Sequence, residues 1–128
     1  MRYSIQQAAE LSGIPAHTLR YYDRQGLLPQ LGRNSSGFRS FSEEDLRWLE
    51  LVSCLKETGM SIENIRRYAE LCQQGDSTLS ERLALFERQR EIILTQMEDL
   101  KRHLETVELK IKIYTDEYAA YKARGGDK

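Results

Sequence analysis

The sequence predicts a mainly α-helical protein built from a small N-terminal domain and one long C-terminal helix. Of its 128 residues, 40% are hydrophobic and 30% charged, and only two are prolines, which suits a helical chain. Short apolar stretches separated by turn residues run to residue 74. Apolar residues then recur at alternating steps of four and three, with no proline or glycine from Leu79 to Tyr121. We therefore expect one domain over residues 1–74 and a linker with a coiled-coil helix over residues 75–128.

Two short helices separated by a tight turn open the chain. Ser4 is a good N-cap for a helix that runs to Leu11, and the Ser-Gly pair ending at Gly13 stops it. Pro15 is suited to the first turn of a second helix, which continues to Arg24. This layout predicts a helix-turn-helix whose second helix is the recognition helix. Many helical hairpins that bind no DNA share the layout, so topology alone does not decide between them.

The second helix carries a polar, partly aromatic face. His17, Tyr21 and Arg24 follow at steps of four and three, and Arg20 lies four residues before Arg24. Arginine and phenol groups displayed together on a short helix are typical of contacts with phosphates and base edges. The alternative is a solvated amphipathic helix whose tyrosines lie at the edge of the core.

A short hairpin, or wing, is expected after this helix. Residues 34–37 read Asn-Ser-Ser-Gly, which favours a turn, and residues 38–41 alternate as a strand does. Arg33 and Arg39 flank the turn, where they could reach phosphates or the minor groove. A hairpin this small must lean on the neighbouring helices.

Two more helices complete the N-terminal domain. Ser42 and the three acids after it favour the start of a third helix, which ends at Thr58-Gly59. Ser61 caps a fourth helix, and the Gln-Gln-Gly-Asp-Ser run at residues 73–77 ends it.

The C-terminal helix has an unbroken heptad pattern that a lone helix could not bury. The pattern favours a partner helix, most simply the same helix of a second copy, over a helix folded back on its own domain. It leaves open whether the two helices run parallel or antiparallel. The a and d positions are Leu79, Leu83, Phe86, Arg90, Ile93, Met97, Leu100, Leu104, Val107, Ile111, Tyr114, Tyr118 and Tyr121.

Charge is distributed unevenly along the chain. The net charge is −1, yet residues 1–41 hold five arginines against two acids, a net +3, so the remainder carries −4. Cys54 and Cys72 form no disulfide framework, no segment looks like a signal or a membrane span, and we expect a cytoplasmic protein with reduced thiols. No nucleophile–base pair, metal-ligand set or phosphate loop appears, so we expect neither an enzyme nor a cofactor.

Taken together, these parts resemble the MerR family of bacterial transcription regulators over nearly the whole chain. The Leu-Arg-Tyr-Tyr run followed by a Gly-Leu-Leu-Pro exit is the most specific part of the resemblance. The matching residues are Ile5, Ala8, Ala9, Gly13, Ile14, the runs Thr18-Leu19-Arg20-Tyr21-Tyr22-Asp23, Gly26-Leu27-Leu28-Pro29 and Gly37-Phe38-Arg39-Ser40-Phe41, and Asp45-Leu46.

The resemblance implies a winged helix-turn-helix domain followed by a long dimerisation helix that forms an antiparallel coiled coil with its twofold mate. It also implies a homodimer that binds double-stranded promoter DNA and distorts it so that RNA polymerase can engage both promoter elements. Phe41 stands where the family usually has tyrosine, and we assign it to the core. The resemblance also implies which residues bind DNA: Ala16, His17 and Thr18 in the major groove, Arg20, Tyr21 and Tyr22 on bases or phosphates, and Arg39 on the wing.

The signal that such a regulator would answer is less well defined. Residues 75–128 contain no cysteine, which leaves almost no ligands for the soft-metal sites of some family members. Cys54 is placed like the cysteine of the thiol-based subgroup that responds to aldehydes or nitrosative stress, so it is the candidate sensor. Alternatives are that Cys54 is a buried core residue, that the regulator responds to a small ligand or partner without thiol chemistry, or that the chain is a coiled-coil adaptor.

Overall fold

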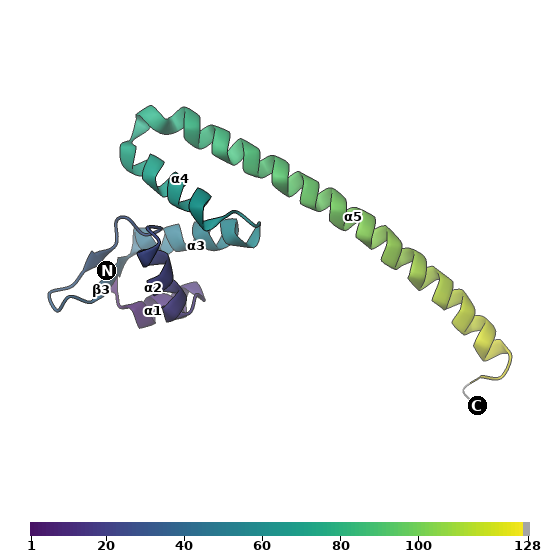
Figure 1. Ribbon diagram of the computed structural model, residues 1–128. Helices are drawn as coiled ribbons and strands as arrows, with labels where there is room; N and C mark the ends of the chain where they lie inside the picture. The colour runs from purple at the N-terminus through teal and green to yellow at the C-terminus, as the bar shows by residue number, and fades with distance from the viewer. Residues whose placement is uncertain (127–128) are drawn as a thin grey trace. The chain divides into compact units, whose positions relative to one another are not determined.

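The computed structural model of the chain describes residues 1–126 and confirms the mainly α architecture with a small β-wing and a long C-terminal helix (Figure 1). It divides into a compact unit from Met1 to Glu87 and a second unit from Arg88 onward. In chain order the elements are β1 (Arg2–Tyr3), α1 (Ile5–Ser12), α2 (Ala16–Arg24), β2 (Gly32–Arg33), β3 (Arg39–Ser42), α3 (Glu43–Glu57), α4 (Ile62–Gln74), the 3-10 turn η1 (Asp76–Thr78) and α5 (Leu79–Ala123).

Local sequence determines where the helices begin. Ser4 Oγ accepts a hydrogen bond from the Gln7 amide at 3.2 Å, and the Gln7 side chain accepts one from the Ser4 amide at 2.9 Å. Ser42 and Asp45 make the same reciprocal pair at the start of α3, at 3.0 and 2.9 Å. Both capping boxes satisfy amides that would otherwise lack a partner in the first turn. Gly13 ends α1 in the left-handed conformation, with a φ of 75°, so the turn into α2 can be tight.

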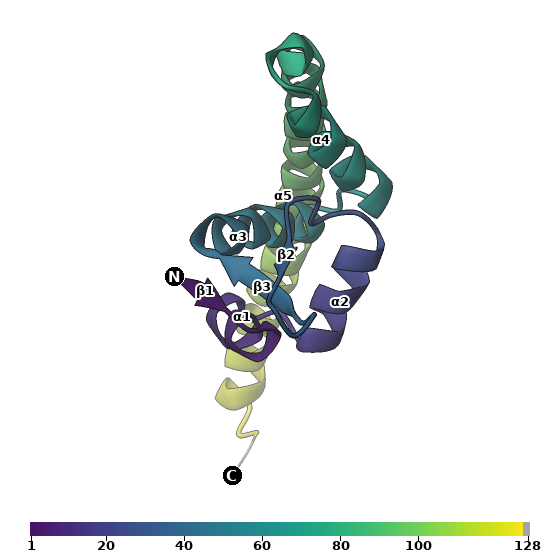
Figure 2. The ribbon, with the colours of Figure 1, turned by 90° about the vertical axis from the view of Figure 1, so that its left-hand side faces the viewer.

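A three-stranded antiparallel sheet in the order β1-β3-β2 forms the wing (Figure 2). The hairpin of β2 and β3 was predicted from the sequence, whereas β1 was not. The Arg2 side chain reinforces the sheet by donating to Ser40 Oγ at 3.0 Å and to the Ser40 carbonyl at 2.8 Å. The strand pairs therefore attach the chain start to the wing.

The core of the first unit lies between the helices and the wing. Phe41 is fully buried, as predicted from the sequence, and packs with Leu19 and Leu49 in one cluster. Leu85 and Phe86, at the start of α5, pack against this cluster, which is why the compact unit continues past the end of α4 to Glu87.

An aromatic chain joins three helices within the first unit. The ring of Trp48 on α3 stacks on Tyr68 of α4, with centroids 5.4 Å apart, and Phe86 of α5 meets Tyr68 edge-on at 4.9 Å. The indole Nε1 donates to the Leu27 carbonyl at 2.6 Å, just beyond α2. The exit from α2 is thereby tied to the helices that follow it.

The heptad helix forms as predicted, as the 45-residue α5. Ten of the apolar and aromatic residues at its a and d positions are 43–66% exposed, including Leu100 and Tyr114. No helix within residues 1–126 is long and apolar enough to cross a membrane.

Candidate nucleic-acid interface

Helix α2 presents most of the side chains that the sequence singled out. His17 and Arg24 are exposed, Tyr21 is 41% exposed, and Arg20 is half-buried. Ala16 and Thr18, in the first turn, are also half-buried. The apolar side of the same helix is anchored by Leu19, which is fully buried. A rigid helix with its polar face turned outward is the arrangement that groove contacts need.

Tyr22 belongs mainly to the core. Its side chain is 8% exposed, and its ring centroid lies 6.2 Å from that of Tyr21. Burial, with a smaller electrostatic effect of Tyr21, raises the pKa of the Tyr22 hydroxyl. The phenol therefore stays neutral at physiological pH, able to donate a hydrogen bond, and its contact with DNA stays a prediction.

The wing is held in shape by its own turn. Asn34 Oδ1 accepts hydrogen bonds from the Ser36 and Phe38 amides at 2.9 and 3.1 Å, and the Asn34 amide donates to the Phe38 carbonyl at 2.8 Å. Gly37 adopts a φ of 83°, which a residue with a Cβ would adopt only with strain. The Phe38 side chain is 70% exposed beside Arg33 and Arg39, a feature that the strand pattern alone did not reveal.

An ion pair connects the wing to α2. Arg39 Nε donates to Asp23 Oδ2 at 2.8 Å, and Arg33 Nη2 lies 4.0 Å from the same oxygen. Figure 2 shows the β2–β3 hairpin beside α2. The structure thus brings the predicted residues of α2 and both wing arginines into one unit. The sequence did not indicate Asp23 as the link.

Of the two cysteines, Cys54 is exposed on α3 and Cys72 is half-buried on α4. The interpretation of Cys54 as a buried core residue is therefore wrong for the single chain. Its side chain lies outside the core cluster that contains Leu49 and Leu55. Its role as a sensor stays a prediction. No group of three or more His, Cys, Asp or Glu side chains suited to a metal ion is found among residues 1–126.

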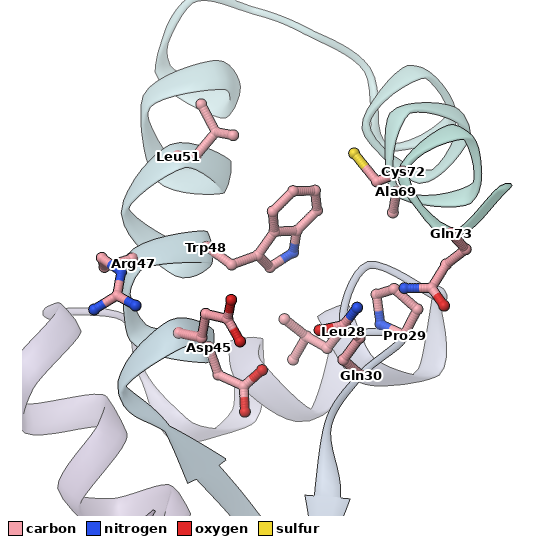
Figure 3. A pocket seen from close by; sticks show the side chains of 11 residues that line it. Leu28, Pro29, Gln30, Asp45, Arg47, Trp48, Leu51, Ala69, Cys72 and Gln73 are labelled. Atoms are coloured by element: carbon pink, nitrogen blue, oxygen red, sulfur yellow. The ribbon is translucent and has the colours of Figure 1, made fainter. Parts of the chain in front are cut away.

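A pocket of about 340 Å³ lies in the first unit and is lined by Cys72 but not by Cys54 (Figure 3). Trp48 and Cys72 point into it from α3 and α4, and Leu28 and Pro29 line it from the loop after α2. Burial and a hydrogen bond with Cys72 raise the pKa of the neighbouring Tyr68. Most of the lining is apolar, so the pocket is suited to a small apolar group.

Comparison with protein families gives two matches that together cover most of the chain. Residues 3–72 match the family described as MerR HTH family regulatory protein, and residues 46–110 match the one described as MerR, DNA binding.

Individual relatives agree with these matches. A helix-turn-helix transcriptional regulator of Haemophilus influenzae, itself uncharacterized, is 49% identical over 114 residues, which make up 89% of this chain and 84% of the relative. The regulator AdhR of Bacillus subtilis is 43% identical over 89 residues, 68% of this chain and 64% of AdhR.

Solved structures share the fold over nearly the full length. HiNmlR, a MerR family regulator that lacks the sensor domain and was crystallised bound to promoter DNA, has 48% identity and a TM-score of 0.86, with 93% of this chain and 94% of HiNmlR covered. A MerR family regulator from Listeria monocytogenes has 34% identity and a TM-score of 0.89, with 98% and 95% covered.

Proposed function

Because this chain belongs to the MerR family of helix-turn-helix transcription regulators, which are not enzymes, we propose that it binds double-stranded promoter DNA as a homodimer. In this proposal α2 enters the major groove, with Ala16, His17 and Thr18 toward base edges, and the wing follows the phosphates. The observation that carries the proposal is the outward polar face of α2 in the same unit as Arg33 and Arg39. The promoter complex of its 48%-identical relative HiNmlR supports it.

Dimerisation is proposed from the exposed apolar row of α5. A helix of 45 residues spans about 67 Å at 1.5 Å per residue, and its a and d positions cannot be covered from within the same helix. An isologous pairing with a second copy would bury the row on both chains. It would also present α2 twice to one duplex.

Transcription control would then follow from DNA distortion. We propose that the dimer bends and untwists the promoter so that RNA polymerase engages both of its elements, and that this takes place in the cytoplasm. Smooth bending of such a site costs roughly 1–6 kcal/mol, which contacts from Arg20, Tyr21, Tyr22 and the wing would offset.

The DNA-binding proposal is tested by salt-dependent binding to a duplex that the wild-type protein selects from a random-sequence library. Arg20→Ala should weaken binding. It should also make the slope of log affinity against log salt concentration shallower, by about the amount that one phosphate contact contributes. Arg102→Ala, an exposed arginine on α5 in the second unit, removes the same charge and serves as the control. Equal affinities and salt slopes for both variants would remove Arg20 from the interface.

For the signal, we propose that electrophiles add to Cys54. The exposed sulfur can attack the carbonyl carbon of an aldehyde: an S–C bond forms, the C=O double bond becomes a single bond, and the carbonyl oxygen takes up the proton that the thiol gives up. Promoter induction by formaldehyde or methylglyoxal should disappear in Cys54→Ser and persist in Cys72→Ser. Induction that survives in Cys54→Ser would eliminate this cysteine as the sensor.

A second candidate, regulation by a small ligand without thiol chemistry, is favoured by the pocket beside Trp48. This is the single tryptophan of the chain, so intrinsic fluorescence reports on the pocket directly. An inducer that acts through the pocket should change the Trp48 fluorescence, and this change should saturate as the inducer concentration rises. The Cys54→Ser variant should respond in the same way as the wild type. Fluorescence that responds only when Cys54 is present would instead favour the thiol mechanism.

A further inference from the structure

Asp23 lies between two arginines of the wing. Arg33 and Arg39 are directly opposite each other in the β2–β3 register. Two like charges in that position destabilise an antiparallel pair. Asp23 Oδ2, which comes from α2, lies 2.8 Å from Arg39 Nε and 4.0 Å from Arg33 Nη2. One carboxylate from the recognition helix therefore offsets the repulsion between two strands of the wing.

The Asp23–Arg39 contact is sheltered from solvent. The side chains of Asp23 and Arg39 are 23% and 20% exposed, whereas that of Arg33 is 56% exposed. Water screens an exposed ion pair strongly and a partly buried one less, so the attraction between these two charges is screened less than in an ordinary surface pair.

Both guanidinium groups are oriented while they keep donors for DNA. Asp23 takes the Nε–H of Arg39, and the two Nη groups of Arg39 carry four further N–H donors. Arg33 Nη1 donates to the Gly37 carbonyl at 2.9 Å, which ties Arg33 to its own turn. These contacts hold the wing against α2 in the absence of DNA.

We propose that Asp23 is a positioning residue that sets how well the protein discriminates its specific site from other DNA. Non-specific binding follows from phosphate neutralisation, which an acid beside the wing weakens. Specific binding needs α2 on base edges while the wing is on the backbone, which the Asp23–Arg39 contact favours by holding the two together. One side chain therefore acts in opposite directions on the two kinds of binding. This inference rests on the proposed DNA-binding function.

The test measures the ratio of affinities for the selected duplex and for a scrambled duplex of the same composition, over a series of salt concentrations. Asp23→Asn keeps the size of the side chain and removes its charge. We expect the ratio to fall about tenfold, because specific affinity drops while non-specific affinity rises. Glu10→Gln is the matched control: it removes the negative charge of an exposed acid on α1 in the same unit and should leave the ratio unchanged.

Arg39→Lys supplies the second arm, since lysine keeps the charge but lacks the Nε donor and the planar fork. The effect of Asp23→Asn on the ratio should be smaller in the Arg39→Lys background, because the Asp23–Arg39 contact that favours specific binding is already lost there. If Asp23→Asn does not fold, Asp23→Glu takes its place: the carboxylate is displaced by one methylene group while the charge is kept, so the specific affinity and the ratio should fall while the non-specific affinity stays unchanged.

If Asp23 had only a structural role, Asp23→Asn would lower the melting temperature and leave the ratio of affinities as in Glu10→Gln. That result would overturn the proposal. An unchanged effect of Asp23→Asn in the Arg39→Lys background would overturn it as well. A wild-type protein that binds both duplexes equally would instead refute the proposed function itself.

Discussion

Replacing Leu104 on α5 by alanine should weaken dimerisation. Leu104 occupies one of the a and d positions of the heptad row and is 56% exposed in the single chain. Full burial of a leucine side chain contributes about 1.5–3 kcal/mol, so burying the exposed half contributes roughly 1 kcal/mol or slightly more per chain. A twofold dimer loses this contribution twice. The expected loss of roughly 2–3 kcal/mol corresponds to a dimer dissociation constant raised about 30- to 150-fold.

The same helix offers a closely matched control in Leu109. It is 58% exposed on α5 but lies outside the a and d row. Leu109→Ala makes the same chemical change with the same small gain in helix propensity. Sedimentation equilibrium over a dilution series measures both dissociation constants. Equal shifts for the two variants, or no shift for Leu104→Ala, would refute the assignment of the heptad row as the dimer seam.

Two further predictions concern the aromatic chain in the first unit. Trp48→Phe removes the donor to the Leu27 carbonyl, and we expect the melting temperature measured by calorimetry to fall by roughly 5 °C; an unchanged value would show that this hydrogen bond contributes no net stability. Burial and the hydrogen bond with Cys72 raise the pKa of Tyr68 above 10.0, so the unfolded chain loses its proton first and the free energy of unfolding falls as pH rises past that value. Tyr68→Phe should make this fall shallower in urea titrations at increasing pH, though not abolish it, because the pKa values of Tyr3 and Tyr22 are raised as well. An equally steep fall in the variant would contradict the role of Tyr68.

Helices were predictable from the sequence because their signals are local. Ser4 and Ser42 cap helices through contacts only three residues away, and the row from Leu79 to Tyr121 repeats within one element. The wing turn at Asn34 is equally local, since its side chain binds amides two and four residues ahead. The burial of Phe41 was predicted from the family resemblance, because phenylalanine stands there in place of the usual tyrosine.

Features that depend on distant pairings were missed. Strand β1 has two residues, too few for an alternating pattern, and it exists because β3 offers a partner forty positions later in the chain. The Asp23–Arg39 contact joins residues 16 positions apart, and the sequence shows Asp23 only as one of two acids in a basic segment. Cys54 could have been a buried core residue by its sequence, yet it is exposed. Which side of a helix the core covers is decided by tertiary packing, beyond what periodicity specifies.

Footprinting of the selected duplex tests the central claim most directly. A homodimer that presents α2 twice should protect two symmetry-related segments about one helical turn, roughly 34–36 Å, apart. Arg20→Ala should weaken both protections together, because each half-site is read by the same helix. A single unsymmetrical protection, or two protections that Arg20→Ala leaves intact, would contradict the assignment of α2 as the recognition helix of a DNA-binding dimer.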